Sequence, residues 1–213
     1  MMSERAGAAP GAPPAHPIEI ESFRILEGRI DLSALGPTAA QVVARVVHAT
    51  ADVELGRSMV VEEAAALAGV AALSEGAAVL CDVEMVRAGL PRLATICRLG
   101  DARAGTGGTP TRSARGAELA ARAHPAGALA VAGCAPTALE RWIDLVEAGL
   151  FRPALVVGLP VGFVGAAEAK AHLREVAGRT GIACISNVGE RGGSAAACGA
   201  VNALAHLSRR LPI

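Results

Sequence analysis

The chain has 213 residues, 52% of them apolar, and its 20 basic and 20 acidic side chains cancel. With one Trp, three Phe and no Tyr it offers no platform for stacking nucleic-acid bases, and its balanced charge steers it neither to nucleic acid nor to an anionic membrane. Five widely spaced cysteines without a C-x-x-C pair predict buried, reduced thiols and no metal site. No signal-peptide core or membrane-spanning run is found, so we expect a soluble, cytoplasmic protein.

The N-terminal part is predicted to be a tail followed by helices. Residues 1–16, rich in Ala, Gly and Pro, predict disorder, and residues 17–213 are expected to form a single domain. Helices are predicted over residues 18–28, from Pro37 to His48, and over about 61–74.

From residue 77 onward, short apolar strands alternate with longer helices. The predicted strands are 77–81, 94–99, 127–132, 154–158 and 182–185, and the predicted helices are 83–88, 111–123, 137–148, 166–177 and 194–209. Such alternation is typical of a parallel sheet covered on both faces. We therefore predict a three-layer αβα fold with a five-stranded, mainly parallel sheet and an α-helical N-terminal extension. Ligands of such folds bind at the carboxyl ends of the strands.

The segment R-V-V-H-A-T-A-D closes the second predicted helix with Arg45, His48 and Asp52. Spacings of i, i+3 and i+7 put these side chains near one helix face. The helix dipole favours a protonated histidine in the last turn, which suits His48 to acid–base chemistry. A structural interpretation stays open, because histidines also cap helix carbonyls and Asp52 could be a turn or N-cap residue.

The first of three glycine-rich loops, residues 105–113, leads from a strand into a helix. Thr111, Arg112 and Ser113 bring hydroxyls, backbone amides and a cation to the start of that helix, which could hold an anion. The loop matches neither a P-loop nor a dinucleotide-binding fingerprint. The alternative is a flexible turn in which Thr111 or Ser113 only caps the helix.

The second loop, residues 158–165, contains an exposed-looking Phe163 between glycines. Glycines there allow the backbone to approach a ligand or another chain closely. Lys170 follows one turn into the next helix, where a lysine opposes the helix dipole and needs an anionic partner. Either Glu168 or a ligand could be that partner.

The third loop, residues 189–194, ends in Gly193 and Ser194, with Ser194 as the predicted N-cap of the last helix. Three loops thus combine glycine amides, hydroxyls and cations. This repetition favours a ligand with several carboxylates or phosphates.

Several motifs occur in an order that is similar to that of the precorrin-8X methylmutases over residues 17–207. They read H-P-I-E-I-E-S-F, R-V-V-H-A-T-A-D, D-V-E-M-V, T-R-S-A, A-P-T-A-L, P-A-L-V-V-G-L-P-V-G-F-V-G-A-A-E and R-G-G-S. The resemblance implies an isomerase of cobalamin biosynthesis that moves a methyl group from C-11 to C-12 of the corrinoid ring. The reaction is a proton-assisted [1,5]-sigmatropic shift that needs no cofactor and no protein-bound metal.

The same resemblance implies that His48 is the catalytic acid–base. It also implies homodimers with the site near the subunit interface. The implied substrate-binding residues are Ser22, Arg45, Thr111, Arg112, Ser113, Lys170, Gly193 and Ser194.

The chain departs from the family pattern at Cys134, Ala169 and Glu190, where many members have asparagine, serine and a basic residue, and at Phe23. The main alternative function is a corrinoid-binding or carrier protein without catalysis. A nucleotide-binding α/β enzyme is disfavoured by the lack of a phosphate-binding fingerprint. The sequence leaves open whether the substrate is precorrin-8X or its cobalt complex, because cobalt would be held in the macrocycle.

Overall fold

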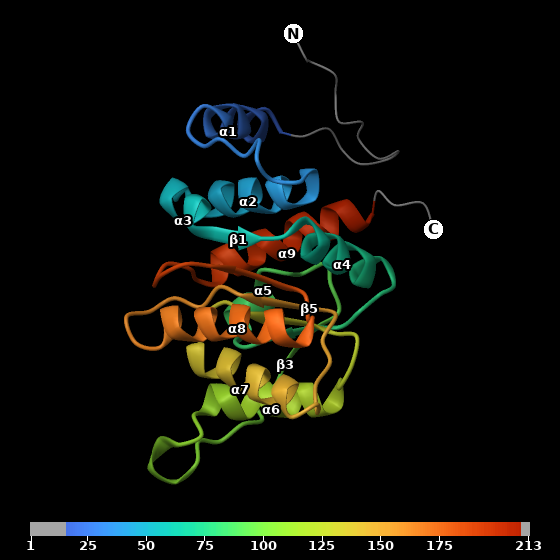
Figure 1. Ribbon diagram of the computed structural model, residues 1–213, viewed down its shortest axis with the longest axis vertical. Helices are drawn as coiled ribbons and strands as arrows, with labels where there is room; N and C mark the ends of the chain where they lie inside the picture. Colours follow the sequence, from blue (N-terminus) through green and yellow to red (C-terminus); the bar gives the residue numbers. More distant parts are fainter. Residues whose placement is uncertain (1–15, 210–213) are drawn as a thin grey trace.

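A six-stranded sheet forms the centre of the protein in a computed structural model that describes residues 16–209 (Figure 1). The strand order is β1-β6-β5-β4-β2-β3, and among the described strands β1 alone runs antiparallel to its neighbour. The strands are β1 (Met59–Val61), β2 (Val79–Cys81), β3 (Thr95–Cys97), β4 (Leu129–Ala132), β5 (Leu155–Gly158) and β6 (Cys184–Asn187).

Helices cover both faces of the sheet. They are α1 (Pro17–Glu27), α2 (Pro37–Thr50), α3 (Val53–Ser58), α4 (Glu63–Ser74), α5 (Glu84–Ala88), α6 (Arg112–Ala123), α7 (Pro136–Glu147), α8 (Ala166–Thr180) and α9 (Ser194–Ser208), with a short 3-10 helix at Thr106–Gly108. The predicted tail lies outside the described residues except for His16, whose Nδ1 accepts a hydrogen bond from the amide of Ile18 at the start of α1.

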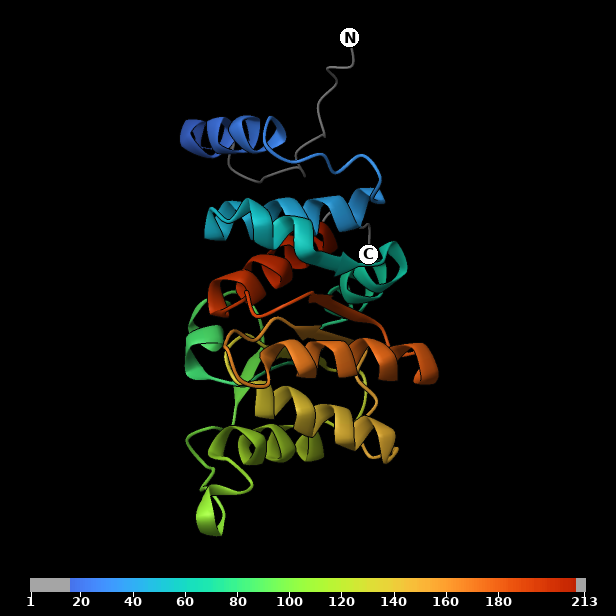
Figure 2. The same ribbon diagram turned by 60° about the vertical axis from the view of Figure 1, so that its left-hand side comes forward.

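Alternating strand residues build two hydrophobic cores. Leu129 and Val131 of β4 face the core under α4, α5 and α9, whereas Ala130 and Ala132 face the core under α6, α7 and α8. Helices α2 and α1 are stacked outside α9, so they lie at one end of the molecule and α6 lies at the other (Figures 1 and 2). The predicted αβα architecture and N-terminal helical extension are confirmed.

Two short elements were missed by the sequence prediction, which gave five strands. Strand β1 pairs with β6, joining Met59 to Asn187 and Val61 to Ile185, so the helix predicted from about residue 61 begins at Glu63 instead. Its strand character comes from pairing with β6 at the edge of the sheet, and β6 is more than a hundred residues away in the chain. The second element, α3, follows directly on α2.

Helix α2 runs two residues beyond the predicted end at His48. It stops at Ala51, a non-glycine residue with φ of 53° whose amide donates to the carbonyl of Val47. Asp52 follows this left-handed residue and caps α3, accepting from the amide of Leu55. The prediction that Asp52 shares a helix face with Arg45 and His48 is therefore wrong, because the chain turns between them.

The first turn of α2 is held by a carboxylate from another helix. Glu63 of α4 accepts hydrogen bonds from the amides of Thr38 (3.1 Å) and Ala39 (2.8 Å). These amides are among the four that a helix leaves unpaired at its start. A side chain at Gly36 would overlap the Glu63 carboxyl group, so glycine at the N-cap makes room for this contact.

Replacing Glu63 with alanine should lower the free energy of unfolding by about 1 kcal/mol, as loss of a helix cap does. Glu62→Ala is the matched control, because Glu62 is exposed and makes no capping hydrogen bond with its side chain. Urea unfolding followed by circular dichroism measures both variants. An equal loss in the two would contradict the capping role of Glu63.

Candidate active site

His48 lies half-buried in the last turn of α2, under helix α1. Its Nδ1 is 2.8 Å from Oγ of Ser22, and its ring stacks on Phe23 with centroids 4.9 Å apart and planes 8° from parallel. Within residues 16–209, no hydrogen bond is made to Nε2. The ring is therefore fixed by one polar and one aromatic contact, and Nε2 is left for another molecule.

Arg45 lies one turn before His48 on α2 and, like His48, faces helix α1. Its Nη1 is 2.7 Å from Oε1 of Glu19, and its guanidinium carbon lies 5.0 Å from the centroid of the Phe23 ring. Glu19, Ser22 and Phe23 are spaced i, i+3 and i+4, so one face of α1 meets one face of α2. The predicted site residues Ser22, Arg45 and His48 are thus brought together.

Asp52 pairs with a residue of another segment and not with a neighbour on α2. Its carboxylate is 2.6 Å from Nη1 of Arg191, which belongs to the loop between β6 and α9. The hydrogen bond from Leu55 and the Arg191 charge hold the pKa of Asp52 below its usual value, against the opposing effect of burial. Ser22 orients His48, and Asp52 joins the end of α2 to this loop.

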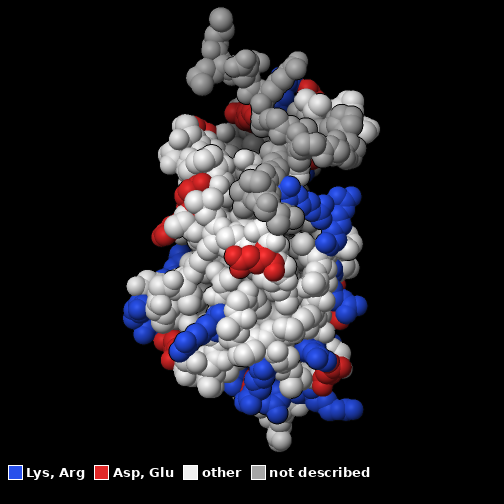
Figure 3. Space-filling model, turned by 90° about the vertical axis from the view of Figure 1, so that its right-hand side faces the viewer, with Lys and Arg blue, Asp and Glu red and all other residues white. Residues whose placement is uncertain are grey.

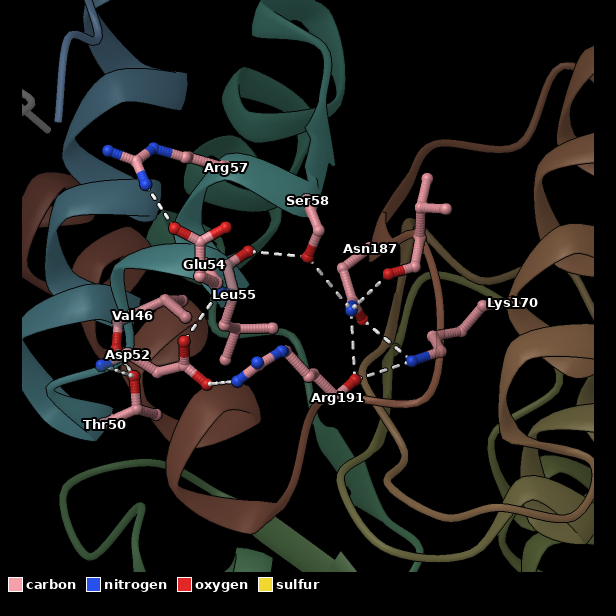
Figure 4. A network of polar contacts seen from close by, with 11 residues as sticks. Val46, Thr50, Asp52, Glu54, Leu55, Arg57, Ser58, Lys170, Asn187 and Arg191 are labelled. Carbon is pink, nitrogen blue, oxygen red and sulfur yellow. Dashed lines mark hydrogen bonds and ion pairs between the residues drawn. The ribbon is translucent and has the colours of Figure 1, made fainter.

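Lys170 is fully buried and holds the same loop from the other side (Figure 4). Its Nζ donates to the Arg191 carbonyl (2.7 Å) and to Oδ1 of the buried Asn187 (3.0 Å). Burial lowers the pKa of Lys170 to about 8, with the charge of Arg174 acting in the same direction and that of Glu190 opposing it. Glu168 is exposed and is not among the hydrogen-bond partners of Lys170, so the internal partner proposed from the sequence is wrong.

The second and third glycine loops pack against each other at the carboxyl ends of β5 and β6. The amide of Gly193 donates to the Leu159 carbonyl (2.8 Å), and the amide of Gly162 donates to the Glu190 carbonyl (3.1 Å). A side chain at Gly192, whose φ is 156°, would overlap the carbonyl oxygens of Leu159 and Pro160. At Gly192, glycine therefore permits close approach within the chain itself.

Gly193 and Ser194 begin helix α9, but not as the sequence predicted. Gly193, with φ of 120°, is the N-cap and makes no side-chain cap, and Ser194 is the first helical residue. Predicting Ser194 as the N-cap was wrong by one residue, since the left-handed backbone at the cap requires glycine. Phe163 in the neighbouring loop is 90% exposed, as its position between glycines suggested.

The first glycine-rich loop, which leads into α6, lies at the opposite end of the molecule. Thr111 caps α6 by accepting from the amide of Ala114 (3.1 Å), and its hydroxyl is 2.7 Å from that of Thr137. Arg112 is exposed and pairs with no carboxylate of residues 16–209, and Ser113 is half-buried beside it. Lys and Arg side chains gather at this end of the surface (Figure 3). Within one chain, the start of α6 with Thr111, Arg112 and Ser113 is therefore far from His48 on α2 (Figure 1).

Asp82 is a buried acidic residue that the sequence prediction did not single out. Its carboxylate accepts hydrogen bonds from the amides of Gly133 (3.2 Å), Cys134 (2.8 Å) and Ala135 (2.7 Å), which fixes the loop between β4 and α7. Burial raises the pKa of Asp82, although these hydrogen bonds act against the rise. An acidic residue directly after a buried apolar strand was the available signal.

Among residues 16–209, no three His, Cys, Asp or Glu side chains lie together in a way that could hold a metal ion. In the same range no helix has the length and apolar character needed to cross a membrane. All five cysteines are free, and Cys81 and Cys198 are buried.

The fold and the site define an α/β enzyme with loops at the carboxyl edge of a mainly parallel sheet and a histidine beneath an N-terminal helix. The family model described as precorrin-8X methylmutase matches residues 17–207. The chain belongs to the precorrin-8X methylmutase family.

Individual relatives support the same assignment. A precorrin-8X methylmutase of Pseudomonas aeruginosa is 38% identical over 193 residues, covering 87% of this chain and 92% of its own. A cobalt-precorrin-8 methylmutase of Methanothermobacter thermautotrophicus is 38% identical over 186 residues, covering 84% of this chain and 85% of its own. The solved structure of a precorrin-8x methyl mutase from Thermus thermophilus matches with a TM-score of 0.78 at 33% identity, covering 90% and 95%.

The buried lysine should give the protein a distinctive pH dependence of stability. Between pH 8 and the ordinary lysine value of 10.5, the unfolded chain binds more protons at Lys170 than the folded chain does. The free energy of unfolding should therefore rise over this range by up to about 3 kcal/mol relative to Lys170→Met. Comparing the two proteins by urea unfolding at several pH values cancels the titration of the cysteines. Parallel pH curves would refute the prediction.

Proposed function

We propose that this chain catalyses the methyl shift from C-11 to C-12 of a corrinoid, acting on precorrin-8X or on its cobalt complex. The family assignment supports this activity. The observation that supports it most directly is His48, fixed through Nδ1 and its ring face, with Nε2 free of described partners. A histidine in this arrangement can give a proton and take it back.

The proposed reaction is an isomerisation, so atoms and electrons balance within the substrate. Nε2 of His48 donates a proton to the conjugated ring, which lowers the barrier to the [1,5]-sigmatropic migration. The bond from C-11 to the methyl group breaks as the bond to C-12 forms. Loss of the ring proton back to His48 restores the enzyme. The rest of the site holds the macrocycle in one orientation.

The substrate carries several carboxylates, and the site offers cations and hydroxyls to hold them. We assign carboxylate binding to Arg45, Arg112, Ser22 and Ser194, with the backbone of the R-G-G-S loop beside them. Lys170 contributes differently from what the family resemblance implied. Because its Nζ is buried and donates within the protein, it positions the loop that presents Gly193 and Ser194.

A homodimer would unite the two separated parts of the site. Within one chain, His48 and Arg112 belong to helices at opposite ends of the long axis (Figure 1). In a closed dimer, the α6 end of one protomer can meet the α1–α2 end of its partner twice. Phe163 and Val164, each about nine-tenths exposed, supply apolar surface for such an interface.

Replacing His48 with alanine should slow methyl migration by about 10²–10⁴-fold, the usual contribution of general acid–base catalysis. The visible spectrum follows turnover of precorrin-8X and of its cobalt complex in separate incubations, which also shows which one is used. His124→Ala is the control, because it also removes one histidine but lies at the C-terminal end of α6, the opposite end of that helix from Arg112. Full activity of the His48 variant would refute the assignment. Binding of both corrinoids without turnover by the wild type would favour a carrier.

Mixed dimers test whether two protomers share each site. His48→Ala and Arg112→Ala should each be weakly active alone, and co-expression with two affinity tags yields the mixed species. In a mixed dimer one site then contains both wild-type residues. A random mixture should therefore regain about a quarter of wild-type activity. Absence of recovery in purified mixed dimers, or a monomer in size-exclusion chromatography, would exclude a shared site.

A further inference from the structure

Arg45, one of the cations assigned to substrate binding, already forms an ion pair within the chain. Arg45 pairs with Glu19 at 2.7 Å, and the two side chains are only 29% and 34% exposed. Glu19 is the one carboxylate of the described residues that forms an ion pair with Arg45. The hydrogen bond from Arg45 holds the pKa of Glu19 below its usual value although burial opposes this, so the carboxylate is ionised at neutral pH.

This ion pair lies within the catalytic cluster. The Phe23 ring stacks on the His48 ring, with 4.9 Å between the two centroids. The guanidinium carbon of Arg45 lies 5.0 Å from the centroid of the same Phe23 ring. Glu19 is one turn before Phe23 on α1, so its carboxylate is delivered to Arg45 beside the histidine. A substrate carboxylate that bound Arg45 next to His48 would have the same chemistry and the same partner.

We infer that Glu19 is a resident carboxylate that occupies Arg45 in the free protein, must be displaced by a carboxylate of the corrinoid, and thereby sets substrate affinity and product release. This inference rests on the proposed function, because it identifies the competing group as a corrinoid carboxylate. It makes Glu19 a determinant of affinity that acts through Arg45.

The displacement has a definite thermodynamic sign. Breaking the internal pair costs free energy that is subtracted from the binding of the ligand, so removal of the Glu19 charge must tighten binding. If Glu19 instead orients Arg45 to receive the substrate, its removal must weaken binding. The direction of the change therefore separates the two roles.

The test is a titration of the full-length protein with the metal-free product hydrogenobyrinate, followed by visible absorption. Glu19→Gln should lower the Kd by about three- to tenfold relative to Glu21→Gln. Glu21 is a matched control, because it is on the same helix, carries the same charge and pairs with Arg24 instead. This control also removes the general effect of one less negative charge on a polyanionic ligand.

A double-mutant cycle shows whether the effect passes through Arg45. In an Arg45→Gln background, Glu19→Gln should no longer change the Kd. In stopped-flow measurements, the wild type should release hydrogenobyrinate faster than Glu19→Gln, and this difference in dissociation rate should account for most of the difference in Kd.

Each outcome has a separate meaning. A Kd for Glu19→Gln equal to or higher than that of Glu21→Gln overturns the inference, as does an effect that persists without Arg45. Failure of the wild type to bind hydrogenobyrinate at all would instead count against the proposed function. If hydrogen exchange shows that α1 opens in Glu19→Gln, then Glu19→Asp decides, because it keeps the charge on α1 and withdraws it by one methylene. Tighter binding supports the inference, and unchanged or weaker binding overturns it.

Discussion

The contacts of Arg191 connect the parts of this structure on which the site depends. Its carbonyl accepts a hydrogen bond from buried Lys170, and its guanidinium pairs with Asp52 directly after α2. The loop after β6 is thus fastened to α8 on one side and to the helix of His48 on the other. Burying a lysine without a carboxylate partner is costly, so the loop must stay in place to supply carbonyl acceptors. Glu63 completes the arrangement by holding the other end of α2.

Most charged groups around His48 are already satisfied within the free chain. Arg45 has Glu19, Asp52 has Arg191, and Lys170 has two oxygen acceptors. This self-pairing avoids unpaired buried charge, while the contacts with Ser22 and Phe23 hold the His48 ring. Arg112, at the other end of the molecule, pairs with no carboxylate of residues 16–209. A polyanionic ligand would therefore find a preorganised acid–base group on one surface and an available cation on another, which is consistent with the proposed sharing of a site between protomers.

Two departures from the family pattern fall where the backbone makes the structural contact. At Cys134 the backbone amide donates to Asp82, so the loop geometry does not depend on an asparagine side chain at this position. At Glu190 the carbonyl accepts from Gly162, while the side chain is exposed. The loop can keep its shape with either residue, although the Glu190 charge also favours the protonated form of Lys170.

The alternation of apolar runs and helices determined the αβα class, the five parallel strands and the position of the glycine loops, because these depend on local periodicity and on backbone freedom at glycine. Local spacing also gave Arg45 and His48 as a pair on one helix. Strand β1, the pairing of Arg45 with Glu19 and the burial of Lys170 were decided by tertiary structure, since each joins segments that are distant in the chain or depends on neighbours from another element. Asp52 shows the difference most clearly. Its helical spacing predicted a place beside His48, but the left-handed turn at Ala51 redirected it to Arg191, and only the folded chain brings that arginine within reach.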